Sequence, residues 1–95
     1  MDYTILFTHD AVADFNNISD FIAQGNPYRA LTFIDELQKR TITTLSLTPY
    51  AGRVYKEKTR FIILRSYVVL YEIEDSNKTV HILRIINSRT DWNKL

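Results

Sequence analysis

Catalysis near neutral pH most often uses histidine, and this chain has two histidines, His9 and His81. Neither is spaced with a nucleophile or with metal ligands in a pattern such as HExxH. The absence of cysteine excludes thiol catalysis and zinc sites built on cysteine. Two glycines are too few for a GxGxxG or GxxxxGK(S/T) phosphate loop. We therefore expect no catalytic residue, no cofactor and no metal site.

Basic side chains in the second half are the strongest candidates for contact with a partner. Residues 48–95 hold nine basic and five acidic residues, whereas residues 1–47 hold three basic and six acidic ones. A basic surface suits an acidic protein segment or a nucleic acid. Arginine offers planar charged donors and tryptophan a large apolar anchor. The expected target-contact residues are Arg53, Arg60, Arg84, Arg89 and Trp92.

A structural role is the alternative for three of these residues. Arg60 and Arg84 can instead form ion pairs with glutamates of a neighbouring strand, Glu72 or Glu74. Trp92 would then close the core.

Length and composition describe one globular domain that spans residues 1–95. The chain is 45% hydrophobic and 13% aromatic, and its net charge of +1 is unlike that of a disordered chain. No segment approaches the roughly 18 apolar residues of a membrane span. The N-terminus lacks the basic and apolar regions of a signal peptide. We expect a cytoplasmic protein with no membrane association.

Apolar spacing predicts a helical hairpin. In residues 9–24 one helical face is formed by Ala11, Phe15, Ile18 and Ile22. Gly25 is expected to end this helix in the left-handed conformation. Asn26 and Pro27 are a typical cap and first residue for a second helix, over 27–47. The short linker makes the two helices antiparallel.

Strands flank the hairpin in the sequence. We expect strands at 3–8, 59–65, 67–74 and 79–87, with turns at 48–52, 65–66 and 75–78. The last three are joined by short loops and must be antiparallel. Alternation predicts that Val80, Ile82, Arg84 and Ile86 share one face of the last strand and that His81, Leu83 and Ile85 share the other.

The fold class that follows is α+β, in the order β-α-α-β-β-β. The N-terminal strand and the helical hairpin pack on one face of an antiparallel sheet. The core is expected to contain Phe15, Ile18, Ile22, Phe33, Ile34, Leu37, Val69, Tyr71, Ile82 and Leu83 or its neighbour. The choice between Ile82 and Leu83 stays open, because sequence fixes strand register weakly. The other sheet face is expected to be partly open to a partner.

A set of short motifs along nearly the whole chain resembles the RelE/ParE superfamily of toxins from type II toxin–antitoxin pairs. The motifs are NPxxA at 26–30, PxxGR at 49–53, YxxxY at 67–71, ILRI at 82–85 and RxDW at 89–92. Each is weak alone, but together they are specific. The resemblance implies the same β-α-α-β-β-β order as the periodicity.

The resemblance also separates two branches. RelE-like toxins are ribosome-dependent mRNA endonucleases, and they typically carry an arginine after the aromatic residue that opens the third strand, with a tyrosine or histidine near the C-terminus. Here Val68 follows Tyr67, and the late tyrosine is absent although Arg89 is present. An apolar side chain cannot hold a phosphate, and tryptophan does not readily exchange a proton. The chain is therefore more similar to ParE-like toxins, which poison DNA gyrase without known catalysis.

Three functions remain open at this point. The first is a ParE-like inhibitor of DNA gyrase, neutralised by a cognate antitoxin whose C-terminal segment is disordered when free, with higher-order toxin–antitoxin assembly as an option. The second is a RelE-like mRNA endonuclease. The third is a non-toxic relative that still binds an antitoxin.

Overall fold

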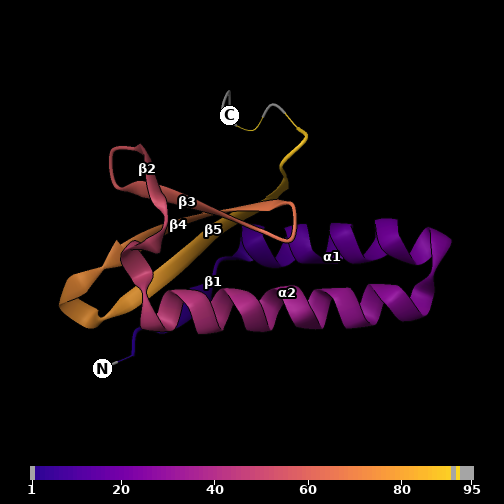
Figure 1. Cartoon of the computed structure of the whole chain (residues 1–95), viewed down its shortest axis with the longest axis horizontal. Helices are drawn as coiled ribbons and strands as arrows, with labels where there is room; N and C mark the ends of the chain where they lie inside the picture. Colours follow the sequence, from indigo (N-terminus) through magenta and orange to yellow (C-terminus); the bar gives the residue numbers. More distant parts are fainter. Residues whose placement is uncertain (1, 91, 93–95) are drawn as a thin grey trace.

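A helical hairpin lies along one face of a five-stranded sheet in the computed structural model, which describes residues 2–90 and 92 (Figure 1). The elements are β1 (Thr4–Phe7), α1 (His9–Gly25), α2 (Pro27–Leu47), η1 (Pro49–Ala51), β2 (Arg53–Lys56), β3 (Thr59–Leu64), β4 (Tyr67–Glu74), η2 (Asp75–Asn77) and β5 (Thr79–Asn87). The predicted α+β class and the position of the hairpin before the meander are confirmed.

The helices begin where polar caps satisfy their first backbone groups. Thr8 accepts a hydrogen bond from the N–H of Ala11 at 3.2 Å, and Asn26 accepts one from the N–H of Arg29 at 3.0 Å. The predicted left-handed Gly25 is wrong, because it is the last residue of α1 and its φ is not positive. The extended residue Asn26 ends α1 and caps α2 at once, so no left-handed residue is needed between the helices.

The sheet has the strand order β1-β5-β4-β3-β2 and is mixed rather than wholly antiparallel. The meander β3-β4-β5 is antiparallel as predicted, whereas β1 pairs with β5 in parallel. The strand β2, which pairs antiparallel with β3, was not predicted. Its four residues are mostly exposed, so they show no apolar alternation. The turn at 65–66 is confirmed: Arg65 and Ser66 both have positive φ, at 52° and 70°, as in the tight hairpins that suit strand twist.

Two apolar clusters cover the two faces of the sheet. The hairpin-side core contains every core residue that the sequence predicted from the helices and from β4, and from β5 it contains Ile82. The open-face cluster consists of Val68, Leu70 and Ile86, with Tyr55, Phe61, Leu83 and Trp92 packed against them. No helix in residues 2–90 is long and apolar enough to cross a membrane.

A β-bulge in β5 corrects the predicted alternation. Leu70 is opposite Arg84 but Tyr71 is opposite Ile82, so Leu83 is the extra residue. The bulge changes the phase of the strand. Ile85 therefore joins the hairpin-side core, and Ile86 joins the open-face cluster, in contrast to the uninterrupted alternation expected from the sequence.

Candidate functional site

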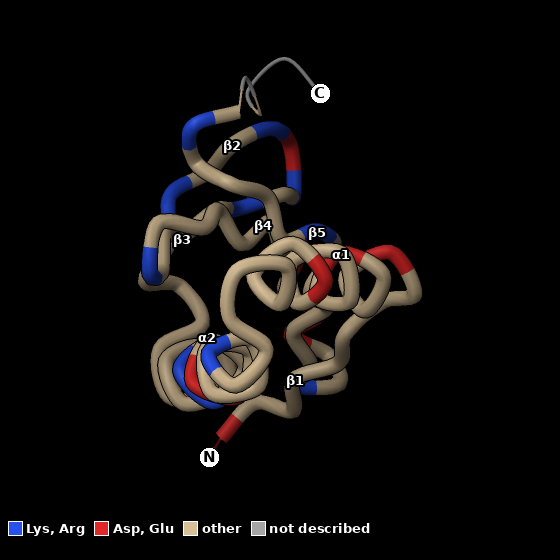
Figure 2. The backbone as a smooth tube through the Cα atoms, turned by 90° about the vertical axis from the view of Figure 1, so that its right-hand side faces the viewer, with Lys and Arg blue, Asp and Glu red and all other residues tan. Residues whose placement is uncertain are grey.

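Charge is unevenly distributed over the fold. Figure 2 shows Lys and Arg on the β2–β3 hairpin and on the chain after β5, whereas α1 carries aspartates and no basic residue. Of the five predicted contact residues, Arg53 lies on β2, Arg60 on β3, Arg84 on β5, and Arg89 and Trp92 follow β5, and the structure does not give them one common role. Arg53, on β2, and Arg89, which follows β5, are exposed.

Arg84 is engaged by the first helix. Its guanidinium group donates two hydrogen bonds to the carboxylate of Asp14, from Nε at 2.7 Å and from Nη2 at 3.0 Å. The same carboxylate accepts a hydrogen bond at 2.8 Å from the N–H of Ile85. The pairing of β1 with β5 ends at Ile82. Beyond that point Asp14, instead of a strand, accepts the hydrogen bond from the backbone N–H of Ile85 at the edge of β5. The sequence predicted an ion pair for Arg84 as an alternative to target contact, but with a strand glutamate instead of this helix aspartate.

Arg60 contacts two residues of the PxxGR segment, Tyr50 and Gly52. Its Nη1 donates to the carbonyl of Gly52 at 2.9 Å, and its guanidinium carbon lies 4.8 Å from the centre of the Tyr50 ring. No ion pair joins Arg60 to Glu72 or Glu74 in the part of the chain that the structure describes. The side chain of Arg60 therefore helps to hold Tyr50 and Gly52 in place.

The buried hydroxyl of Tyr71 holds the same segment. It donates to the carbonyl of Pro49 at 2.8 Å and accepts from the N–H of Gly52 at 2.9 Å. A Cβ on residue 52 would collide with this hydroxyl and with the carbonyl of Phe61. Glycine is therefore required here by close approach of the backbone to β3 and β4, and this turn directs the chain into Arg53.

Trp92 packs against aromatic rings on the open face. Its ring centre lies 4.9 Å from that of Phe61 and 5.6 Å from that of Tyr55. This packing agrees with the predicted alternative in which Trp92 closes a core, here the open-face cluster. Trp92 remains partly exposed.

A network of hydroxyls and a carboxylate joins three distant segments. Asp75, after β4, accepts hydrogen bonds from the hydroxyls of Tyr3 and Tyr50, the first at 2.6 Å. These two bonds lower the pKa of Asp75, and the bond to Asp75 raises the pKa of Tyr50. Lys78 lies 5.2 Å from the centre of the Tyr3 ring. The network fixes η1 against β1 and the β4–β5 turn.

Titratable groups elsewhere serve local contacts. His81 lies 2.9 Å from Glu74, and this hydrogen bond lowers the pKa of the glutamate. Burial raises the pKa of Tyr71, so its hydroxyl stays protonated, and the hydrogen bond to Asp14 raises that of Arg84. Among residues 2–90 and 92, no three acidic or histidine side chains are grouped to hold a metal ion.

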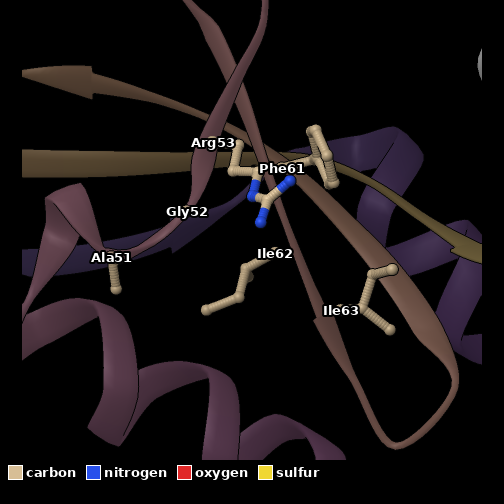
Figure 3. Close-up of a pocket in the computed structure, with 6 residues that line it drawn as sticks. All are labelled: Ala51, Gly52, Arg53, Phe61, Ile62 and Ile63. Atoms are coloured by element: carbon tan, nitrogen blue, oxygen red, sulfur yellow. The ribbon is translucent and has the colours of Figure 1, made fainter.

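A shallow groove of about 330 Å³ lies beside Arg53, at the outer edge of β3. Figure 3 shows the Arg53 guanidinium group and the side chains of Ala51, Ile62 and Ile63 around it. Its lining is apolar except for Arg53. Arg53 was predicted from the sequence as a contact residue, but this edge of β3 was not, because it depends on where β2 ends. The contact made by Asp14 and the hydrogen bonds of the Tyr71 hydroxyl were not predicted either. Tyr71 was predicted only as a core residue, and the PxxGR and YxxxY motifs were the available signal for its role.

The chain matches one family model and is similar in fold to several solved structures. Residues 5–92 match the model of the ParE toxin of the type II toxin–antitoxin system parDE. The fold is similar to a structure of the chromosomal ParDE toxin–antitoxin system from P. aeruginosa, with a TM-score of 0.76 and 22% identity over 90% of this chain and 95% of that one.

Two toxin–antitoxin complexes are also similar. One is the RelBE2 complex from Mycobacterium tuberculosis, with a TM-score of 0.72 and 25% identity over 92% of each chain. The other is the intact RelBE complex from E. coli, with a TM-score of 0.63 and 20% identity over 90% of this chain and 95% of that one. No curated protein matches the sequence significantly. The family match extends over almost the whole chain, and we conclude that this protein belongs to the ParE family of toxins from type II toxin–antitoxin systems.

Proposed function

We propose that this ParE-family toxin inhibits DNA gyrase by binding it and trapping cleaved DNA, and that it does so in the cytoplasm. The observation that carries the proposal is the environment of Val68. It occupies the position where RelE-like toxins typically carry an arginine, and it is wholly buried in the open-face cluster. A buried apolar side chain offers no charge to a scissile phosphate. This environment argues against RNA cleavage on the sheet and for action by binding.

The contact surface that we propose is centred on Arg53 and Arg89. Both side chains are exposed, Arg53 on β2 and Arg89 just after β5, and Trp92 is partly exposed and contributes to the same surface. Arg60 and Arg84 complete the set of predicted residues, and we assign them the task of positioning this surface through Gly52 and Asp14.

A supercoiling assay with purified gyrase tests this proposal. Wild-type protein should block supercoiling and accumulate cleaved DNA. Arg89→Ala should lose inhibition without a change in melting temperature, because its side chain is exposed. Arg40→Ala, an exposed arginine on α2, is the matched control and should inhibit normally. Trp92→Ala should lose both inhibition and some stability, since its ring packs on Phe61. Full inhibition by Arg89→Ala would place the target surface elsewhere.

We further propose that a cognate antitoxin neutralises the toxin through a C-terminal segment that is disordered when free. The basic second half and the exposed apolar residues of the sheet suit an amphipathic acidic segment. Two of the similar structures are toxin–antitoxin complexes, and higher-order assembly of such a complex is part of the proposal. Co-expression with the neighbouring gene should give a complex whose association rate falls with salt. Purification of both proteins without any complex would contradict it.

A further inference from the structure

One side of α2 carries a stripe of exposed residues at the spacing of a coiled-coil seam. The members of this α2 stripe follow one another at alternate steps of three and four residues, and all are exposed: Tyr28, Leu31, Asp35, Gln38 and Ile42. They extend over about 21 Å of the helix. The stripe is apolar at both ends and polar in its centre, and its two most exposed members are Tyr28 at 77% and Leu31 at 72%.

The α2 stripe is separate from the two sides of the helix that already have partners. The fully buried Leu37 and Thr41 face the core. Glu36 binds Arg65 of the β3–β4 turn at 2.8 Å, so its side of the helix faces the sheet. At 3.6 residues per turn, the middle of the stripe lies roughly 120° around the helix from each of these sides. The stripe is therefore a third side of α2, open to solvent.

The pattern of the α2 stripe is complementary to itself when a second copy lies antiparallel. A two-fold axis midway between Asp35 and Gln38 places Leu31 opposite Ile42 of the second copy. The same axis places Asp35 opposite Gln38 of the second copy. Each pair then occurs twice, as a closed two-fold interface requires. Apolar residues meet apolar residues, and the carboxylate meets a carboxamide that donates hydrogen bonds.

The polar centre gives this pairing its direction. A parallel pair of helices would place the two Asp35 carboxylates against each other, whereas the antiparallel pair keeps each of them opposite a donor. Lys39 lies 3.0 Å from Asp35 of its own helix and adds positive charge beside the same carboxylate. A polar layer inside an apolar seam fixes the register and the orientation of paired helices.

The helix that carries the stripe is folded before it pairs. Five buried residues hold α2 on the core, Leu37 and Leu45 among them, so association costs no helix formation. A net charge of +1 produces little repulsion between two copies. A seam of two heptads is short, and the expected dimer is accordingly weak and reversible.

We propose that this toxin associates with a second copy of itself as a two-fold dimer, in which the α2 stripes pack antiparallel. Figure 2 shows β2 and the chain after β5 at the opposite end of the view from α2. The proposed target-contact residues Arg53 and Arg89 lie on those two segments, so they stay exposed in both copies. The dimer thus presents two contact surfaces, and its formation does not depend on which target they bind.

Sedimentation equilibrium of the purified full-length protein measures this association. Between about 1 µM and about 500 µM, where weak interfaces dissociate, we expect a change from monomer to dimer. Leu31→Lys should raise the dissociation constant at least about tenfold, because it removes an apolar contact from both halves of the interface. Leu47→Lys is the matched control, since Leu47 is 63% exposed on the opposite side of α2. A monomer at every concentration, or a dimer that Leu31→Lys leaves unchanged, would overturn the proposal.

Substitutions of Gln38 test the orientation of the two helices. Gln38→Lys places a positive charge opposite Asp35 of the second copy and should tighten the dimer about threefold. Gln38→Glu places a second carboxylate there and should weaken it by a similar factor. In a parallel dimer residue 38 lies opposite itself, so both substitutions bring like charges together. Weakening by both variants refutes the antiparallel seam.

Introduced cysteines report the register directly, because the chain contains no cysteine of its own. In an equal mixture of Leu31→Cys and Ile42→Cys, mild oxidation should join residue 31 of one copy to residue 42 of the other. Disulfides only between like positions would contradict the proposed register. A protein that stays monomeric, and whose folded Leu31→Lys variant no longer inhibits gyrase, would assign the α2 stripe to the target instead of to a second copy.

Discussion

Removing one oxygen atom from the core should loosen the turn that leads into Arg53. The hydroxyl of Tyr71 is fully buried and makes two hydrogen bonds, to the carbonyl of Pro49 and from the N–H of Gly52. Tyr71→Phe keeps the ring but leaves both buried backbone groups without this partner. Each unsatisfied group costs about 1–3 kcal/mol, so the two groups together should lower the free energy of unfolding by about 2–6 kcal/mol.

Thermal unfolding of Tyr71→Phe measures this cost. For a domain of this size, each kcal/mol lowers the melting temperature by roughly 4–8 °C, so even the lower bound of about 2 kcal/mol corresponds to a fall of roughly 8–16 °C. Tyr67→Phe, on the same strand, is the matched control and should change the melting temperature little. Burial raises the pKa of Tyr71 above its ordinary value of 10.0. The stabilisation that the protonated Tyr71 hydroxyl gives to the folded protein is therefore complete below about pH 10 and is lost as pH rises through the pKa of this hydroxyl in the folded protein. A variant as stable as the wild type would refute the reasoning.

Three further predictions concern stability. Gly52→Ala should destabilise the fold strongly because its Cβ collides with the neighbouring strand, whereas Gly25→Ala, in open space at the end of a helix, should be neutral or stabilise by up to about 1 kcal/mol in chemical denaturation. Asp14→Ala should cost about 1–2 kcal/mol in urea unfolding, while Asp20→Ala on the same helix should cost nearly nothing; equal effects would contradict the role given to the edge contact. Two tyrosine hydroxyls lower the pKa of Asp75 below 3.8, so the stabilisation from its carboxylate is present above about pH 4 and is lost as pH falls through the folded-state pKa. In Asp75→Asn the melting temperature should therefore fall less steeply with decreasing pH on the acid side. An unchanged slope there would argue against the network.

Sequence periodicity predicted the elements whose faces are buried. The helices and β4 were predicted together with their core residues, because each alternates between apolar and polar positions at its own period. The strand β2 has no buried face, and the parallel pairing of β1 depends on tertiary contacts, so neither left a periodic signal. The bulge at Leu83 escaped prediction for a related reason, since an extra residue changes the phase without changing composition.

The candidate site was predicted in its residue types but not in its partners. Arginine can serve as a contact, an ion-pair partner or a support for backbone, and the sequence does not rank these roles. The structure assigns Arg84 to Asp14, which is 70 residues away along the chain, and Arg60 to the carbonyl of Gly52. Such long-range partners arise from packing of α1 against β5 and of β2 against β3, which local patterns do not encode.

Induction of the toxin in bacterial cells tests the central claim most directly. In one culture, double-strand DNA breaks and the incorporation of labelled amino acids should be followed over the first minutes after induction. Inhibition of gyrase predicts early DNA breaks and filamentation while translation continues. An immediate stop of translation with codon-specific cleavage of mRNA, and without DNA breaks, would contradict the assignment and establish the nuclease activity of the RelE-like branch.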